Sequence, residues 1–292
     1  MAKTTAAQRE FLENTTLLAA MRLVFGGLAH AETSTRRLRE FAETASGGTP
    51  DRKQSAYFNG KTAWIKSGEL NDGLITISEE YITEDGLAHS SAKIFPRGTL
   101  VVALYGATVG RTGILNMEAA TNQAVCAIFP RADIAMSQYL YWFFRFKRPD
   151  FLNESFGGAQ PNISQKVLRE TVIPIPPIQL QNDVCRFLES VELRQKGKTD
   201  TDIPSLFPPL SDVRRAVLRI EGLVHAIKEA RRLKQQSMGL AELLLSSRMD
   251  EIFSLSESIK TARIADVCRM ASGGTPSRTH PEFFENGDIP WI

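Results

Sequence analysis

The stretches that come nearest to catalytic motifs each lack a residue that the chemistry needs. Residues 106–112 (GATVGRT) are one residue shorter than a phosphate-binding loop, and Arg111 stands where that loop requires lysine. Gly47 and Gly48 lack the third glycine of a dinucleotide-binding fingerprint, and Pro50 follows them. We therefore predict turns at both places, with residues 106–112 joining two strands as a hairpin.

The residue pattern also predicts neither a metal site nor a catalytic nucleophile. The four histidines are scattered without ligand spacing, and no G-x-S-x-G nucleophile motif occurs. The acidic residues form no recognisable nuclease cluster. The prolines of residues 175–178 (IPPI) lack the polar residue that precedes them in adenine methyltransferases. We expect no catalytic residue, no metal and no cofactor; a stand-alone nuclease built on scattered carboxylates is the less favoured alternative.

Composition and charge bound the class of protein. Of 292 residues, 42% are hydrophobic and 23% charged, which is ordinary for a globular protein. A net charge of +2 and a pI of about 8.4 permit a local basic face but do not demonstrate nucleic-acid binding. There is no apolar run of membrane-spanning length and no secretory signal. The three cysteines are far apart in sequence. We expect free thiols in a cytoplasmic protein.

The elements that must position any site begin with a helix over residues 5–28, which Gly26 and Gly27 are expected to end. Between residues 35 and 130, β-branched and aromatic runs separated by Gly, Pro, Asn and Asp predict strands. The runs are residues 62–66, 99–105, 108–115 and 124–129.

Helices dominate the next part of the sequence. Residues 136–147 (MSQYLYWFFRFK) predict a buried helix that Pro149 stops, with its aromatic side chains in the core. A short helix is expected over residues 163–170 with Ser164 as its cap. Residues 172–177 (VIPIPP) must form an extended edge because three prolines remove donors. A helix follows over residues 178–195.

A polar, proline-rich linker at residues 196–211 leads into a long helix expected over residues 212–253. Its apolar residues are spaced alternately by four and three, as in a coiled coil. They are Val213, Val217, Ile220, Val224 and Ile227. Roughly 40 helical residues reach about 60 Å, so we expect a partner helix along this interface. Two ordinary helices broken near Gly239 are the alternative.

The chain also contains about one and a quarter copies of a long repeat. Residues 45–50 (ASGGTP) recur unchanged as residues 271–276, an offset of 226. Other pairs at or near this offset are Arg52 with Arg278, Trp64 with Trp291, Leu17 with Leu243, Leu18 with Leu244, and Arg22 with Arg248. A period this long indicates a domain plus a spacer. We interpret residues 254–292 as the truncated start of a second domain.

Several short stretches, taken in order, resemble the specificity (S) subunits of type I DNA restriction–modification systems. They include residues 46–50 (SGGTP), 64–70 (WIKSGEL), 121–125 (TNQAV), 158–164 (GAQPNIS) and 173–177 (IPIPP). No single stretch is specific, but their order and spacing together are. The resemblance covers residue 37 to about residue 195, the long helix after it, and the repeated start.

The resemblance implies an α+β fold: a mixed α/β target-recognition domain with a long coiled-coil-type spacer helix. The domain would span residues 35–195, after an N-terminal helix region at residues 1–34. Such a chain is a non-catalytic subunit that binds double-stranded DNA at a split site. It directs a methylation subunit and a restriction subunit, which carry the chemistry. The alternative is a half-subunit that acts mainly as a homodimerising scaffold through the long helix.

A recognition domain of this kind needs donors and acceptors for base edges and phosphates. The candidates are Lys66, Ser67, Lys93, Arg111, Gln160 and Asn162. Gln and Asn pair bidentately with adenine, and Arg with guanine. Structural roles are open for several of them. Gln160 and Asn162 alternatively cap the helix near Ser164, and Lys66 and Arg111 either contact phosphates or are solvated. We expect residues 121–123 (TNQ) to form turn hydrogen bonds.

Overall fold

The computed structural model describes residues 6–30, 33–154, 162–198, 200–206 and 210–254, together with residues 263 and 268–269. The chain divides into two compact units, residues 1–229 and residues 230–292. The long helix α6 (Val213–Ser254) begins in the first unit, and its residues from 230 onward belong to the second.

The first unit is built on a five-stranded sheet in the order β2-β10-β7-β8-β4. Its strands are β2 (Ala42–Ser46), β10 (Val125–Pro130), β7 (Leu100–Ala103), β8 (Thr112–Leu115) and β4 (Gly73–Ile75). Neighbouring strands are antiparallel except β4, which runs parallel to β8. Helix α3 (Ser137–Glu154) packs against β7, β8 and β10. Its buried aromatic residues fill the space beneath the sheet.

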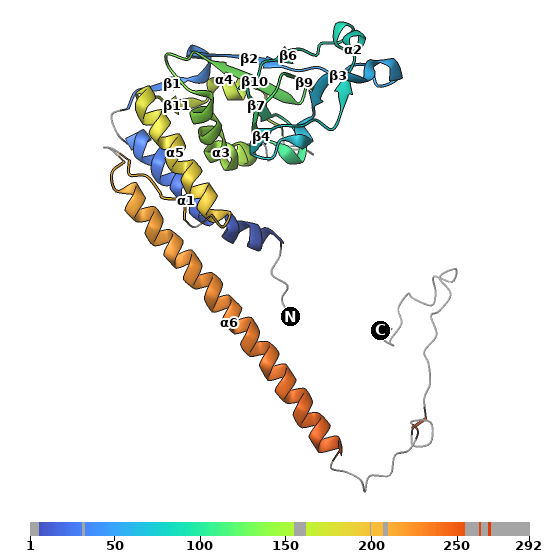
Figure 1. Cartoon of the computed structure of the whole chain (residues 1–292), viewed down its shortest axis with the longest axis vertical. Helices are drawn as coiled ribbons and strands as arrows, with labels where there is room; N and C mark the ends of the chain where they lie inside the picture. Colours follow the sequence, from blue (N-terminus) through green and yellow to red (C-terminus); the bar gives the residue numbers. More distant parts are fainter. Residues whose placement is uncertain are drawn as a thin grey trace, which may run out of the picture. The chain divides into compact units, whose positions relative to one another are not determined.

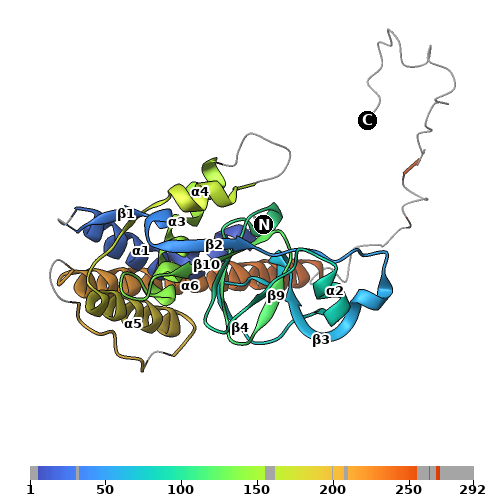
Figure 2. The ribbon, with the colours of Figure 1, turned by 90° about the horizontal axis from the view of Figure 1, so that it is seen from above.

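A four-stranded sheet in the order β5-β3-β9-β6 lies beside the five-stranded sheet. Its strands are β5 (Tyr81–Ile82), β3 (Phe58–Ile65), β9 (Ala119–Thr121) and β6 (Ile94–Phe95), with β3 parallel to β9. The short helix α2 (Glu84–Ala88) follows β5. Single helical turns are η1 (Leu38–Glu40), η2 (Ser55–Tyr57), η3 (Ser67–Glu69) and η4 (Gly106–Thr108). Figure 2 shows β3, β9 and α2 at the end of the unit away from α5.

Three helices form the other layer of this unit. Helices α1 (Ala6–His30) and α5 (Ile178–Gln195) pack against each other and against α3 (Figure 1). Their main core is aromatic: the ring of Phe25 meets Tyr139 and Phe143 edge to face, at centroid distances of 5.7 and 5.4 Å. Strand β11 (Val172–Pro174) pairs with β1 (Thr35–Arg37), and α4 (Gln165–Glu170) lies against η1.

Most of the expected elements are present. The α+β fold class and the long C-terminal helix are confirmed, and residues 106–112 do join two antiparallel strands. The proline-rich stretch forms the edge strand β11, and Ser164 caps α4 by accepting from Val167 N–H. The aromatic residues of α3 are core, as expected. The cysteines are free thiols, with Cys126 and Cys185 buried.

Two predicted helix ends are wrong. Helix α1 continues through Gly26 and Gly27 to His30. A Cβ at Gly27 would lie 2.8 Å from Cδ2 of Leu210, so glycine serves close packing here instead of ending the helix. Helix α3 continues past Pro149 to Glu154. Beyond the proline, Phe151 is buried and stacks on Phe144, which compensates for the backbone donor that proline lacks.

The described residues of the second unit are mainly the remainder of α6. From residue 231 to residue 252 almost every side chain is exposed, including several leucines. No helix among the described residues combines the length and the apolar character needed to cross a membrane. The predicted second-domain start at residues 254–292 falls almost wholly outside the described residues.

Candidate nucleic-acid interface

Eight strands of the first unit begin or end at the same place. In the five-stranded sheet, the ends of β2 and β7 lie beside the starts of β10, β8 and β4. The paired residues that show this are Ser46–Cys126, Val125–Ala103, Val102–Thr112 and Gly113–Gly73. In the four-stranded sheet, the ends of β3 and β9 lie beside the start of β6. The paired residues here are Ile65–Thr121 and Ile94–Ala120. Residues 122–124 connect β9 directly to β10, so both sheets share this end. We call residues 47–54, 66–67, 93, 104–111, 122–124 and 162 the strand-end rim.

Every predicted DNA-contact residue that the structure describes lies on this rim. Lys66 and Ser67 follow β3, Lys93 precedes β6, and Arg111 precedes β8. Asn162 forms an isolated backbone bridge with Tyr105, just after β7. Lys93 and Asn162 are exposed, whereas Lys66, Ser67 and Arg111 are half-buried. Gln160 lies outside the described residues. The rim thus collects predicted contact residues that are as many as 96 positions apart in sequence (66 to 162).

Lys66 is held by two carboxylates. Its Nζ lies 2.9 Å from Oε2 of Glu79 and 2.9 Å from Oε1 of Glu80. Hydrogen bonds to Glu80 and Glu79 raise the pKa of Lys66 above its usual value. Hydrogen bonds from Arg52 and Lys66 lower the pKa of Glu80. Lys66 therefore stays charged, but nearby acids offset its attraction for an anion.

Arg52 is a rim residue that the sequence did not identify as a contact candidate. Its guanidinium carbon lies 4.8 Å from the ring centroids of both Phe58 and Trp64, and its Nη1 lies 2.6 Å from Oε2 of Glu80. Contact with two aromatic rings restricts the orientation of the guanidinium, and its planar donor edges suit bidentate recognition of bases or phosphates. Only the match of Arg52 to Arg278 in the repeat singled it out in the sequence.

Close backbone packing explains the glycines of residues 46–50. Gly48 donates from its N–H to Thr121 O at 2.9 Å, and Gly48 O accepts from Trp64 Nε1 at 2.9 Å. A Cβ at Gly47 would lie 2.0 Å from Thr121 O, so no larger residue fits there.

Gln123 joins three segments of the rim. Its side-chain oxygen accepts from the hydroxyl of Thr49, and its backbone carbonyl accepts from the hydroxyl of Tyr105 at 2.9 Å. Asn122 Oδ1 accepts from Ala124 N–H, which confirms turn-type hydrogen bonding in residues 121–123. Because Ser164 caps α4, Asn162 is not needed for that role and its exposed side chain faces solvent on the rim.

The predicted helix interface divides into two parts. Val213 and Val217 are buried in the main core of their own unit, and Val224 is 9% exposed. Ile220 is half-buried, and Ile227 is 45% exposed. The beginning of α6 thus packs on its own chain, and its outward residues remain accessible.

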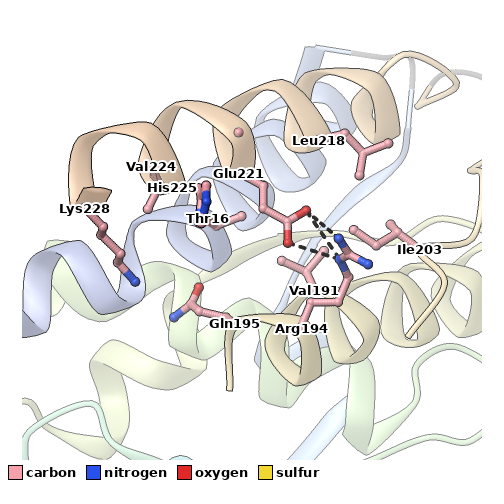
Figure 3. A pocket seen from close by; sticks show the side chains of 11 residues that line it. Thr16, Val191, Arg194, Gln195, Ile203, Leu218, Glu221, Val224, His225 and Lys228 are labelled. Atoms are coloured by element: carbon pink, nitrogen blue, oxygen red, sulfur yellow. Dashed lines mark hydrogen bonds and ion pairs between the residues drawn. The ribbon is translucent and has the colours of Figure 1, made fainter. Parts of the chain in front are cut away.

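A groove of about 520 Å³ lies between α1, α5 and the start of α6 (Figure 3). An ion pair between Arg194 of α5 and Glu221 of α6 joins two sides of the groove. Arg194 Nε lies 3.1 Å from Glu221 Oε1, and Arg194 Nη2 lies 3.1 Å from Glu221 Oε2. Leu218, Val224 and His225 line the α6 side of the groove. The ion pair between Arg194 and Glu221 could not be predicted from sequence spacing, because the two residues are 27 positions apart.

The described residues contain no cluster of side chains suited to holding a metal ion. Within that part of the chain, no group of three or more histidine, cysteine, aspartate or glutamate side chains gathers to hold a metal. The polar groups of the rim instead form a surface of donors, acceptors and cations along strand ends and turns. Turns at the ends of rigid strands are common places for binding residues.

Comparison with known proteins identifies the family. The model of the type I restriction modification DNA specificity domain matches residues 31–200, which is more than half of the chain. The chain is 26% identical over 263 residues to the type I restriction enzyme MjaIX specificity subunit of Methanocaldococcus jannaschii, covering 88% of this chain and 56% of that protein. It is also 26% identical over 175 residues to the EcoR124I/EcoR124II specificity subunit of Escherichia coli, covering 58% and 43%.

A solved structure from work on complex assembly and conformational transition of the type I R-M system has a similar fold. Its TM-score is 0.51 at 18% sequence identity, covering 77% of this chain and 52% of that chain. This likeness concerns the fold alone. The chain spans about half the length of the curated relatives that it matches. On the match of residues 31–200, the chain belongs to the type I restriction–modification DNA specificity domain family.

Proposed function

We propose that the chain recognises a sequence in double-stranded DNA and directs the methylation and restriction subunits of a type I complex to it. The observation that carries the proposal is the strand-end rim, where both sheets place cationic and amide side chains. Membership of the specificity-domain family supports the same reading. In this proposal the chain itself is non-catalytic and needs no cofactor.

The rim has groups for both parts of DNA recognition. Lys93 and Arg52 would hold phosphates, while the exposed amide of Asn162 would pair with a base edge. The hydrogen bonds of Gln123 fix the turn between them. A rim supported by two sheets would hold these groups in register, which selective base recognition requires.

Binding of the full chain to a fluorescent library of random duplexes tests this proposal. Anisotropy measured from 50 to 200 mM KCl should show binding that weakens steeply with salt, as counterion release requires. Sequencing the bound fraction over successive rounds should reveal an enriched motif. Lys93→Gln should weaken binding. Arg131→Gln, which changes an exposed arginine just after the opposite end of β10, is the matched control. Salt-independent or absent binding would contradict the proposal.

Recruitment of partner subunits is assigned to the helical side of the chain. The outward residues at the start of α6, Leu218, Leu223 and Ile227, are 40%, 65% and 45% exposed. A partner that covered them would gain hydrophobic burial. Co-expression with the methylation subunit of the same system should give a stable complex, and Leu223→Glu should weaken it. Co-purification that is the same for wild type and Leu223→Glu would remove this surface from the proposal.

A second candidate function, homodimerisation through α6, is favoured by one observation. Leu17 of α1 is 3% exposed, whereas its counterpart in the repeat, Leu243 of α6, is 68% exposed. Leu240, Leu244 and Leu245 are also more than 60% exposed. Light scattering on the full chain should give the mass of a dimer, and Leu244→Glu should give the mass of a monomer. A monomeric wild type would exclude this candidate.

A further inference from the structure

A polar hollow of about 380 Å³ lies where the strand-end rim meets the helices. Its charged lining comes from three places: the turns at Asp72 and Arg111, helix α3, and the C-terminal part of α5. These side chains are Asp72, Arg111, Arg145, Arg148, Glu192 and Lys196. Helix α1 supplies an apolar wall. The side chains come from four segments, so the fold builds the hollow as a concave surface and no single loop accounts for it.

The lining carries more positive than negative charge. Arg111, Arg145, Arg148 and Lys196 contribute four positive charges, against two negative charges from Asp72 and Glu192, which leaves an excess of two. Both carboxylates are already engaged. Arg148 Nη1 lies 3.0 Å from Asp72 Oδ2, Arg145 Nη2 lies 3.0 Å from Glu192 Oε1, and Lys196 Nζ lies 3.3 Å from Glu192 Oε2. An anion entering the hollow would meet uncompensated positive charge.

Among the cations that line the hollow, Arg111 has a buried donor without a partner. Its Nε is buried and has no hydrogen-bond partner among the described residues. A buried donor without a partner is destabilising, and more so when it belongs to a charged group. Gly110 has a φ of +72°, and a Cβ there would lie 2.9 Å from Arg148 Cγ. The glycine therefore lets the stem of Arg148 pack against the backbone beside Arg111, and both side chains line the hollow.

We propose that this hollow binds an oxyanion, and that its occupant is a phosphate of the DNA backbone. Guanidinium groups match phosphate oxygens bidentately, and the side chains of Arg111, Arg145 and Arg148 all line the hollow. DNA is the favoured source because Arg111 directly precedes β8 on the same rim as Lys66, Lys93 and Asn162. This inference rests on the proposed DNA recognition, and it adds Arg148 and Lys196 to the contact surface.

The first experiment uses inorganic phosphate as the probe on the full chain. Thermal unfolding is followed in sodium phosphate and in sodium chloride of equal ionic strength. Phosphate should raise the Tm of wild type and of Arg131→Gln more than the Tm of Arg111→Gln. Lys196→Gln is the second test variant, because its 63%-exposed side chain can be changed with little risk to folding. Equal phosphate effects in all four proteins would overturn the site.

The second experiment uses a duplex and separates this site from the proposed function. Arg111→Gln and Lys196→Gln should each reduce the slope of log K against log salt by about one, and should weaken binding roughly tenfold at fixed salt. Arg131→Gln should keep the wild-type slope. Unchanged slopes in a chain that still binds DNA would overturn this inference and leave the proposed function standing. Absence of DNA binding by wild type would overturn the proposed function, and with it DNA as the occupant.

Discussion

The side-chain oxygen of Gln181 accepts a hydrogen bond from the backbone N–H of Met136 at 3.0 Å. Nε2 of Gln181 donates to Ile134 O at 2.8 Å and to Pro176 O at 2.9 Å. The residue is fully buried at the start of α5. One amide thus fastens the start of α5 to the segment that enters α3 and to the proline-rich segment before α5. In the segment before α5, Pro174, Pro176 and Pro177 lack backbone N–H groups, so a side-chain donor such as Gln181 supplies hydrogen bonds there.

Replacing Gln181 with leucine should destabilise the first unit by about 2–3 kcal/mol, because three backbone groups in half-buried or buried residues lose their partner at once. Urea unfolding followed by circular dichroism measures the change. Gln179→Leu is the matched control, since Gln179 is exposed two residues earlier in the same helix and should change stability by less than about 0.5 kcal/mol. Equal losses in the two variants would show that the buried amide has no special role.

The ion pair between Arg194 and Glu221 predicts a local effect on the start of α6. Glu221→Gln should lower the local stability of residues 213–228 by about 1 kcal/mol, because the side chains are only 23% and 28% exposed. Hydrogen exchange of the backbone amides in these residues measures it. Arg215→Gln is the control, since Arg215 is 82% exposed and its pairing with Asp212 is long, at 3.9 Å. Faster exchange in both variants, or in neither, would contradict this role of Glu221.

Much of the architecture could be predicted because it follows from local pattern. The spacing of apolar residues, the Ser164 cap and the three prolines of residues 172–177 each act within a few residues. The predicted helix ends at Gly26 and Pro149 were wrong because packing against the rest of the unit outweighs local preference there. Leu210 packs against Gly27, and Phe151 is buried in the main core. The residues around Gly26 and Pro149 do not by themselves indicate this packing.

The candidate site was predictable in its residue types but not in its electrostatics. Lys66 was identified as a cation after a strand, yet its charge is offset by Glu79 and Glu80. That pairing depends on the segment before β5 folding back beside β3, which the sequence does not specify. Arg52 was overlooked as a contact for a similar reason. Its aromatic partners, Phe58 and Trp64, lie 6 and 12 residues away on a strand with an irregular register.

The pairing of Lys66 predicts that removing an acid strengthens DNA binding. Glu79 is 70% exposed, so Glu79→Gln should release Lys66 in part without disturbing the fold, and should tighten duplex binding about threefold at low salt. Fluorescence anisotropy measures the affinity. Asp133→Asn is the matched control, because it also frees an arginine, Arg131, but beyond the opposite end of β10. Equal tightening in both variants would mean that net charge, and not the position of Lys66, controls binding.

The buried thiols predict loss of stability at alkaline pH. Burial raises the pKa of Cys126 and of Cys185 from the ordinary 9.0 to about 12. Between pH 9 and 12 the unfolded chain therefore releases thiol protons that the folded chain retains, which favours unfolding. The stabilisation is complete below pH 9 and is lost as the pH rises toward 12. From pH 8 to pH 10, the free energy of unfolding should fall by roughly 1 kcal/mol for each thiol.

Urea unfolding at pH 8, 9 and 10 measures this fall, and the double variant Cys126→Ala, Cys185→Ala isolates the thiols. The variant will be less stable than wild type at every pH because its core loses two sulfur atoms, so the comparison concerns the slope with pH. Tyr139 and Tyr141 also have pKa values raised by burial, but tyrosine in the unfolded chain ionises near 10, above most of this range. The variant should therefore lose most of the pH dependence between pH 8 and pH 9.5. A slope equal to that of wild type would show that the thiols ionise alike in the folded and unfolded states, contrary to their burial.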